Sequence, residues 1–128
     1  MAQIRVLHVA KEFSRVLGPR HSKDGRNSAE EFRELLASRL KEAIKLNIML
    51  VVVLDGATGY NARFLDEAFG GLHREGLFKP TEILGYMSFV SEENPKLIEK
   101  INNYISDSIS CPSIVSLYKH RNDVLTKE

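Results

Sequence analysis

Seven consecutive apolar residues, at positions 48–54, form the clearest hydrophobic pattern in the chain. The run is rich in valine and stops at Asp55-Gly56, which is a turn signal. A short valine-rich run bounded by a turn is typical of a strand covered on both faces, as in the parallel sheets of α/β proteins. We therefore expect a central strand here. The loop that follows would lie at the sheet edge where open α/β folds usually place their working surface.

The first amphipathic helix is predicted to begin at Ser28. Ser28-Ala29-Glu30-Glu31 matches a capping box, in which the serine hydroxyl and the glutamate carboxylate each satisfy a backbone N–H group. An apolar stripe at helical spacing continues from Phe32 to Ile44, with charged residues elsewhere around the axis. The pattern predicts one buried face.

A second helix is predicted after the central strand, reaching about Arg74 and closed by Gly76. Asp66 and Glu67 are expected in its first turn, where the helix dipole favours anions. The pair Gly70-Gly71 is unfavourable inside a helix, so we expect another part of the chain to approach closely at this point.

Other segments complete the predicted order of strands and helices. Residues 4–10 and 82–90 are expected to be strands, and Asn94-Pro95 is expected to start a third helix that reaches about Ile109. Residues 113–118 fit either a last strand or a short helix. The alternation predicts an α/β fold with a small mixed, largely parallel sheet of about four strands and three or four helices. We expect a single domain, 1–128, with its core at about 3–109 and no firm assignment for 110–128.

Composition narrows the function classes. The 18 Lys and Arg residues balance 17 Asp and Glu residues, so no global field attracts nucleic acid or an anionic membrane. The single cysteine, Cys111, cannot form an intramolecular disulfide, and the N-terminus lacks the apolar core of a secretory signal. The longest apolar run is far below the ~20 residues that span a bilayer. We expect a cytoplasmic protein with no nucleic-acid or membrane partner.

Three segments of the chain resemble the STAS-like domains of unknown function, small bacterial relatives of the sulfate transporter and anti-sigma factor antagonist fold. The resemblance covers about Val6 to Ile105. Its motifs are Leu54-Asp55-Gly56, Phe64-Leu65-Asp66-Glu67-Ala68-Phe69-Gly70-Gly71-Leu72 and, upstream, Gly25-Arg26-Asn27-Ser28-Ala29-Glu30-Glu31-Phe32-Arg33. The resemblance implies a sheet with helices mainly on one side. It also implies a non-enzymatic regulatory role in signal transduction, through protein–protein interaction.

The resemblance further implies a protein partner of the histidine-kinase ATPase or anti-sigma type. In STAS antagonists, such a kinase phosphorylates a Ser or Thr at the start of the helix after the central strand. Here that turn reads Tyr60-Asn61-Ala62-Arg63 and has no such hydroxyl. Thr58, in the preceding loop, is the remaining candidate phosphoacceptor.

The loop and helix start after the central strand hold the candidate partner-binding residues. The span offers an amphipathic ring, an amide and a guanidinium, a mixture found in protein interfaces. Two alternatives stay open for Asp55, which would hold a partner's cation or a loop amide, or form a turn bond with Gly56. Tyr60 is either an exposed anchor or folded over the end of the sheet. The candidates are Asp55, Thr58, Tyr60, Asn61, Arg63, Asp66 and Glu67.

The basic loop at 18–28 supports an alternative function, a small anion or nucleotide sensor. Arginines before a helix N-terminus can gather a phosphate or carboxylate together with free backbone N–H groups. The candidate anion-binding residues are Arg20, His21, Arg26 and Ser28.

Catalysis and cofactor binding receive little support from the sequence. The first strand is not followed by a Gly-x-Gly-x-x-Gly turn, and no phosphate-binding Gly-x-x-x-x-Gly-Lys motif occurs. None of the histidines has metal-ligand spacing with another histidine or with Cys111. A minimal hydrolase using Asp55 with a loop histidine is the third hypothesis. We expect no enzyme, no cofactor and no metal, and whether two copies associate stays open.

Overall fold

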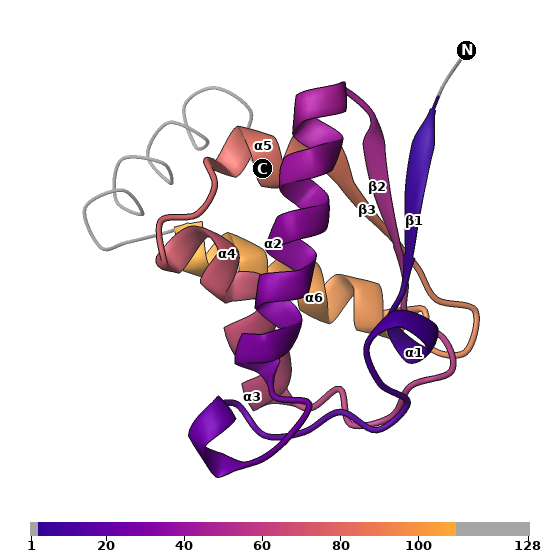
Figure 1. The fold of residues 1–128 in the computed structure, drawn as a ribbon, viewed down its shortest axis with the longest axis vertical. Helices are drawn as coiled ribbons and strands as arrows, with labels where there is room; N and C mark the ends of the chain where they lie inside the picture. The colour runs from indigo at the N-terminus through magenta and orange to yellow at the C-terminus, as the bar shows by residue number, and fades with distance from the viewer. Residues whose placement is uncertain (1–2, 110–128) are drawn as a thin grey trace, which may run out of the picture.

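The computed structural model describes residues 3–109, which fold into a parallel sheet with its helices packed on one side (Figure 1). Parallel strands β1 and β3 flank the central β2. The elements in chain order are β1 (Ile4–His8), α1 (Val9–Glu12), the 3₁₀ turn η1 (Ser22–Asp24), α2 (Ala29–Leu46), β2 (Met49–Val53), α3 (Ala62–Leu65), the π-helical turn η2 (Asp66–Gly70), α4 (Gly71–Arg74), α5 (Pro80–Tyr86), β3 (Met87–Val90) and α6 (Lys96–Ile109).

Strand β2 is central, as predicted, but only one of its faces is fully covered. Leu50 and Val52 are completely buried against the helices, whereas the alternate residues Met49, Val51 and Val53 are only partly buried. On β1, Leu7 and Arg5 lie on the side that faces the helices: Leu7 is buried, and Arg5 pairs with Glu42 of α2. The sheet therefore has a core face and an open face among the described residues.

Helix α2 forms as its local sequence predicts. Ser28 caps it, because the Ser28 hydroxyl accepts the Glu31 N–H group and the Glu31 carboxylate accepts the Ser28 N–H group. The helix ends at Leu46, and the C-cap residue Asn47 adopts the left-handed conformation with φ 55°. Its apolar stripe is buried, and Phe32 packs against Phe13, Phe64 and Phe69 at ring distances of 5.2–5.9 Å.

The helix after β2 runs from Ala62 to Arg74 as three segments, α3, η2 and α4. Its predicted end is confirmed, since Gly76 adopts φ 75° and donates its N–H group to His73. The close approach predicted at the glycine pair is also confirmed. A Cβ atom on Gly70 would lie 3.2 Å from the Tyr104 carbonyl oxygen of α6, and one on Gly71 would lie 2.6 Å from the Arg33 guanidinium.

The predicted positions of three parts of the chain need correction. Residues 82–90 are not one strand: α5 takes 80–86 and β3 takes only 87–90. Proline at the first helical position and Glu82, which closes onto the Lys79 N–H group, start this helix. The first strand ends at His8, and Val9 begins α1. Asp66 and Glu67 follow the first turn of their helix rather than forming it, because Asn61 starts that helix.

The α/β class is confirmed, with a sheet of three parallel strands in the described residues in place of about four. The predicted element at 113–118 lies outside those residues. No helix between residues 3 and 109 is both long and apolar enough to span a membrane.

Candidate functional site

The loops that follow the three strands meet at the carboxyl edge of the sheet, at the bottom of Figure 1. Asp55 joins the loop after β2 to the loop after β3. Its carboxylate accepts the Ser91 hydroxyl and the backbone N–H groups of Glu92 and Glu93 at 2.9–3.2 Å. In return, the Glu93 carboxylate accepts the Gly56 N–H group at 3.0 Å. The backbone donors of Glu92 and Glu93 hold the pKa of the Asp55 carboxyl below its ordinary value.

A short parallel bridge joins the loop after β1 to the loop after β2. It pairs Val16 with Thr58: the Thr58 N–H group donates to the Arg15 carbonyl, and the Leu17 N–H group donates to the Thr58 carbonyl, at 2.8 and 2.9 Å. Gly59 lies under this bridge, where a Cβ atom would come within 3.0 Å of the Leu17 carbonyl oxygen. Together with Asp55, the bridge fixes the three loops to one another.

Tyr60 is folded over the end of the sheet. Its hydroxyl donates to the Leu54 carbonyl at 2.8 Å, and its ring contacts Phe64 edge-on at 6.5 Å. Burial raises the pKa of the Tyr60 phenol, and the Asp55 carboxylate adds to the effect. The Tyr60 side chain therefore ties this loop back to the end of β2.

Replacing Tyr60 with phenylalanine is expected to lower the free energy of unfolding by about 1 kcal/mol. The substitution removes the hydroxyl that donates a hydrogen bond to the Leu54 carbonyl. Urea denaturation followed by circular dichroism measures the change. Tyr86→Phe, which removes the exposed hydrogen bond to Asn47, is the control and should cost less. Equal losses in the two variants would contradict the supporting role of Tyr60.

The start of α3 is an exposed ridge between two hollows. The Asn61 side chain accepts the Phe64 N–H group at 2.9 Å and so caps the helix, while Ala62 and Arg63 are exposed. One hollow, of about 630 Å³, is shared with the basic loop. The other, of about 400 Å³, is shared with Lys100, Asn103, Tyr104 and Asp107 of α6.

We call this part of the molecule the carboxyl-edge surface. It consists of the exposed residues of the bridge and of the α3 start. They are Val16, Thr58, Gly59, Asn61, Ala62 and Arg63.

The predicted basic loop is a compact Ω-loop over residues 18–27. Its ends meet where the Gly18 N–H group donates to the Asn27 carbonyl at 2.8 Å. Gly18 is required at this neck, because a Cβ atom there would lie 2.0 Å from the Arg26 carbonyl oxygen. The loop also holds the N-terminus of α2, since the Ala29 and Glu30 N–H groups donate to the carbonyls of Pro19 and Arg20.

The Ω-loop uses most of the groups predicted to bind an anion. The Ser28 hydroxyl caps α2 and contacts the Ser22 hydroxyl. The Arg20 guanidinium donates to the Asp66 carboxylate at 3.1 Å, and His21 Nδ1 lies 3.5 Å from the Glu30 carboxylate. Of the four predicted residues, Arg26 alone is classed as exposed. An anion would have to displace these internal bonds to reach the helix N-terminus.

Beside the Ω-loop lies a set of paired charges that we call the arginine–carboxylate cluster: Arg20, Arg33, Asp66, Glu67 and Arg74. Glu67 is only 8% exposed and lies 2.5 Å from Arg33 Nη1. The Arg33 guanidinium also donates to the Glu67 carbonyl, and Arg74 donates to the Asp66 carbonyl. Two arginines thus bond carbonyls of the π-helical turn, where the regular α-helical bonding is interrupted.

Asp66 and Glu67, two of the predicted partner-binding residues, both belong to this cluster. Arg33 and Arg74 were not singled out from the sequence. Their partners lie far along the chain or across the glycine pair, so no local spacing indicates them. The same holds for Val16, which the bridge exposes on the carboxyl-edge surface.

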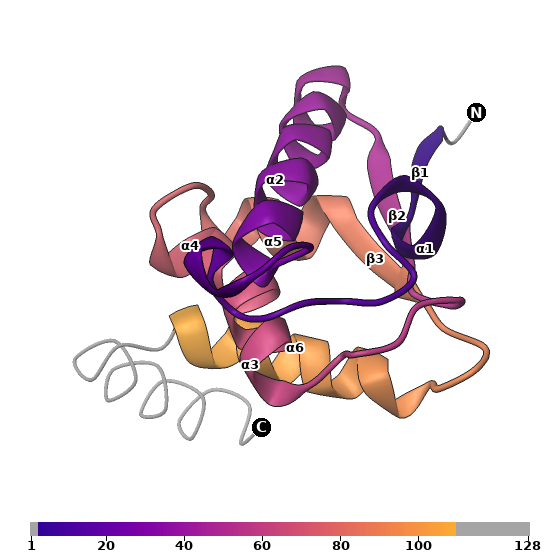
Figure 2. The same cartoon turned by 60° about the horizontal axis from the view of Figure 1, so that its bottom comes forward.

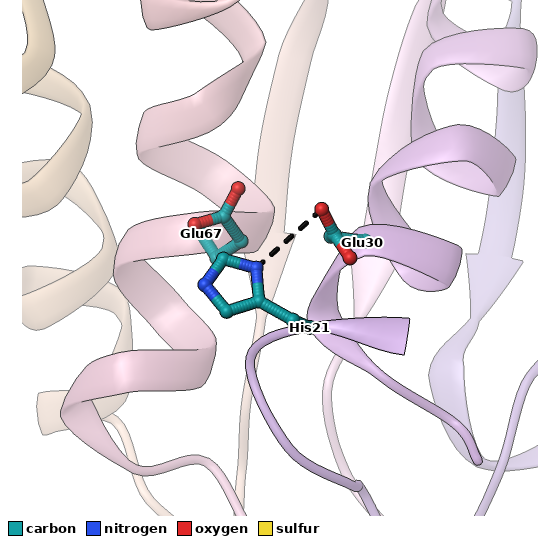
Figure 3. Close-up of side chains that lie close together, drawn as sticks. All are labelled: His21, Glu30 and Glu67. Carbon is teal, nitrogen blue, oxygen red and sulfur yellow. Dashed lines mark ion pairs between the residues drawn. The ribbon is translucent and has the colours of Figure 1, made fainter. Parts of the chain in front are cut away.

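Figure 3 shows His21, Glu30 and Glu67 close together, with ligand-type atoms within 4.8 Å of one another. One imidazole and two carboxylates could in principle hold a divalent metal ion. The Glu67 carboxylate, however, lies within 4.0 Å of the guanidinium groups of Arg20, Arg33 and Arg74. A metal ion would have to compete with those cations, so the geometry favours an ion-pair network. Within this network, the Ser22 N–H group donates a hydrogen bond to the Glu30 carboxylate and lowers the pKa of that carboxyl.

Buried polar groups in this region are satisfied. Between residues 3 and 109, no buried side-chain nitrogen or oxygen lacks a hydrogen-bond partner. The charged side chains of the arginine–carboxylate cluster and of Asp55 therefore make contacts within the chain. The exposed groups of the carboxyl-edge surface are the ones available to a ligand or partner.

No protein-family model matches the chain, and searches among curated proteins and among solved structures found no match.

Proposed function

We propose that this chain is a STAS-like, non-enzymatic interaction module that docks a regulatory protein through the carboxyl-edge surface, in the cytoplasm of a bacterial cell. The observation that carries the proposal is the exposed ridge at the start of α3, which has a hollow on each side. The resemblance described above suggests a partner of the histidine-kinase ATPase or anti-sigma type.

Rigidity supports docking at this surface. The Asp55 bonds and the Val16–Thr58 bridge link the three loops to one another within the chain itself. A preorganised surface loses less conformational entropy on binding, so more of the contact energy appears as affinity. The surface also mixes an apolar side chain, Val16, which is 67% exposed, with the Arg63 guanidinium and exposed loop backbone.

The internal pairing of Asp66 and Glu67 changes which residues we propose to contact the partner. Both carboxylates are bonded to arginines of this chain, and Glu67 is buried. We therefore assign docking to Val16, Thr58, Asn61 and Arg63. Thr58 is exposed, which leaves it accessible as the candidate phosphoacceptor.

The same pairing favours docking over the anion sensor. The N–H groups at the start of α2 are taken by Pro19, Arg20 and Ser28, and the Arg20 guanidinium is taken by Asp66. A hydrolase built on Asp55 is disfavoured for a similar reason, because Ser91, Glu92 and Glu93 already use that carboxylate.

The proposal is tested by affinity capture from the native host with the wild type and with the double variant Val16→Asp plus Arg63→Glu. We expect at least a tenfold loss of the captured partner, since a charge enters the centre of the surface and another is reversed at its rim. The matched control is Leu84→Asp plus Lys45→Glu, which makes the same charge changes at exposed sites on α5 and α2. Equal capture by both double variants, or no specific partner of the wild type, would overturn the proposal.

A further inference from the structure

The uncovered side of the sheet is a largely apolar face, in which His8 and Ser88 are the polar residues. Strand register places Ile4 beside Met49, Val6 beside Val51 and Ser88, and His8 beside Val53 and Val90. Alternation along each strand puts all eight residues on the side opposite the buried Leu7, Leu50, Val52 and Met87. We call these eight residues the open face. Ile4, Val6 and Val90 are 55%, 38% and 40% exposed.

An all-parallel sheet with one bare face is unusual. Parallel sheets occur almost only where both faces are covered, because their strands are apolar on both sides. Here α2, α4 and α5 lie on the core side of the strands, and Figure 1 shows no described helix on the other side. Leaving valine, isoleucine and methionine side chains in water costs roughly 25 cal/mol per Å² of apolar area. Covering the open face with another apolar surface would therefore be energetically favourable.

We propose that a second copy of this chain covers the open face, so that two sheets pack face to face around a twofold axis. The face carries no Lys, Arg, Asp or Glu, so pairing it with itself brings no like charges together. The net charge of +1 adds little repulsion between copies. Two sheets packed in this way lie about 10 Å apart, and their inner side chains interdigitate.

The chain's own last segment is the competing occupant, and the path of α6 speaks against it. In Figures 1 and 2, α6 runs from the carboxyl ends of the strands toward α4 and away from the sheet. The described chain therefore ends, at the last turn of α6, on the side away from the open face. A second copy reaches that face without crossing the helical layer.

The size of the face sets the expected strength. Two strand spacings of about 4.8 Å and five residues at about 3.3 Å give a patch on the order of 10 by 17 Å. That is well below the ~800 Å² per partner of a standard stable interface. The dimer should therefore be reversible, forming as the protein concentration rises rather than persisting at all concentrations.

Sedimentation equilibrium of the full chain, from about 10 µM to about 1 mM, tests the proposal. We expect a monomer–dimer equilibrium in the wild type and at least a tenfold weaker association in Val6→Asp and in Ile4→Asp. Leu84→Asp is the matched control, because it introduces the same charge at a more exposed apolar residue, on α5 and outside both the open face and the carboxyl-edge surface, and it should associate like the wild type. Circular dichroism checks that each variant is folded. Two positions are substituted separately, so that the test still stands if one substitution unfolds the sheet.

A monomer up to the highest concentration, or a dimer that both face variants leave unchanged, would overturn the proposal. A nitroxide label on Cys111, the single cysteine, distinguishes coverage of the open face by the chain's own last segment from coverage by a second copy. At about 50 µM, where the dimer should be a minor species, strong paramagnetic broadening of the Val6 and Val51 methyl signals would show that the chain's own last segment covers the face. Little broadening at this concentration, together with association of the unlabelled chain as the concentration rises, supports the second copy.

Discussion

Replacing Arg33 with methionine is expected to lower the free energy of unfolding by about 3 kcal/mol. The substitution keeps most of the aliphatic stem but removes the guanidinium that bonds the Glu67 carboxylate and carbonyl. Both side chains are nearly buried, at 13% and 10% exposure, so the remaining carboxylate has little access to water. Breaking a buried ion pair by removing one partner typically costs 3–5 kcal/mol. We expect the lower end, because Arg20 and Arg74 stay within 4.0 Å of Glu67.

Urea denaturation measures this loss of unfolding free energy, and two further variants show whether the buried ion pair is its cause. Arg33→Met combined with Glu67→Leu should recover most of the stability, since no unpaired charge then remains in the interior. Arg39→Met, on the same helix, breaks the more exposed pair with Glu12 and should cost less than about 1 kcal/mol. Equal losses in Arg33→Met and Arg39→Met would contradict the buried role of Arg33.

Replacing Asp55 with asparagine is expected to cost about 1.5–3 kcal/mol near neutral pH. The carboxylate accepts two backbone N–H groups and a hydroxyl from the loop after β3, and hydrogen bonds to a charged group are the stronger kind. Asparagine keeps the size and one acceptor but loses the charge. Asp107→Asn, at an exposed position on α6, is the control and should change stability little.

The Asp55 effect should depend on pH with a defined sign. The folded state holds the pKa of this carboxyl below its ordinary value, so the contribution is fully present above the unfolded pKa of ~3.9. It is lost as the pH falls from there through the lower folded value. The difference between the wild type and Asp55→Asn should therefore be constant from pH 7 to about pH 5 and shrink below about pH 4. A difference that grows in acid would contradict the assignment.

Features set by local sequence were predictable. The capping box at Ser28 needs only residues three positions apart, and the structure contains both of its bonds. The valine-rich strand was also identified correctly, since its pattern and its turn signal lie within a few residues. Gly70-Gly71 indicated a close approach, although the sequence could not say that Arg33 and the Tyr104 carbonyl are what approaches.

Pairings between distant residues were not predictable. Arg20 and Asp66 are 46 positions apart, and Arg33 and Glu67 are 34 apart, so their contact depends on how α2 and η2 pack. The start of α5, by contrast, is marked locally. Pro80 and Glu82 are a helix start signal of the same kind as the capping box at Ser28, and α5 forms there although the apolar residues that follow predict a strand.

The interlocking of the loops at the carboxyl edge has a consequence for engineering. Because Asp55 reaches the loop after β3 and Thr58 pairs with the loop after β1, none of these segments can be exchanged by itself without losing a partner in another. A peptide tag or a reporter domain is better inserted near Gly76, whose surroundings are open and whose neighbours are exposed.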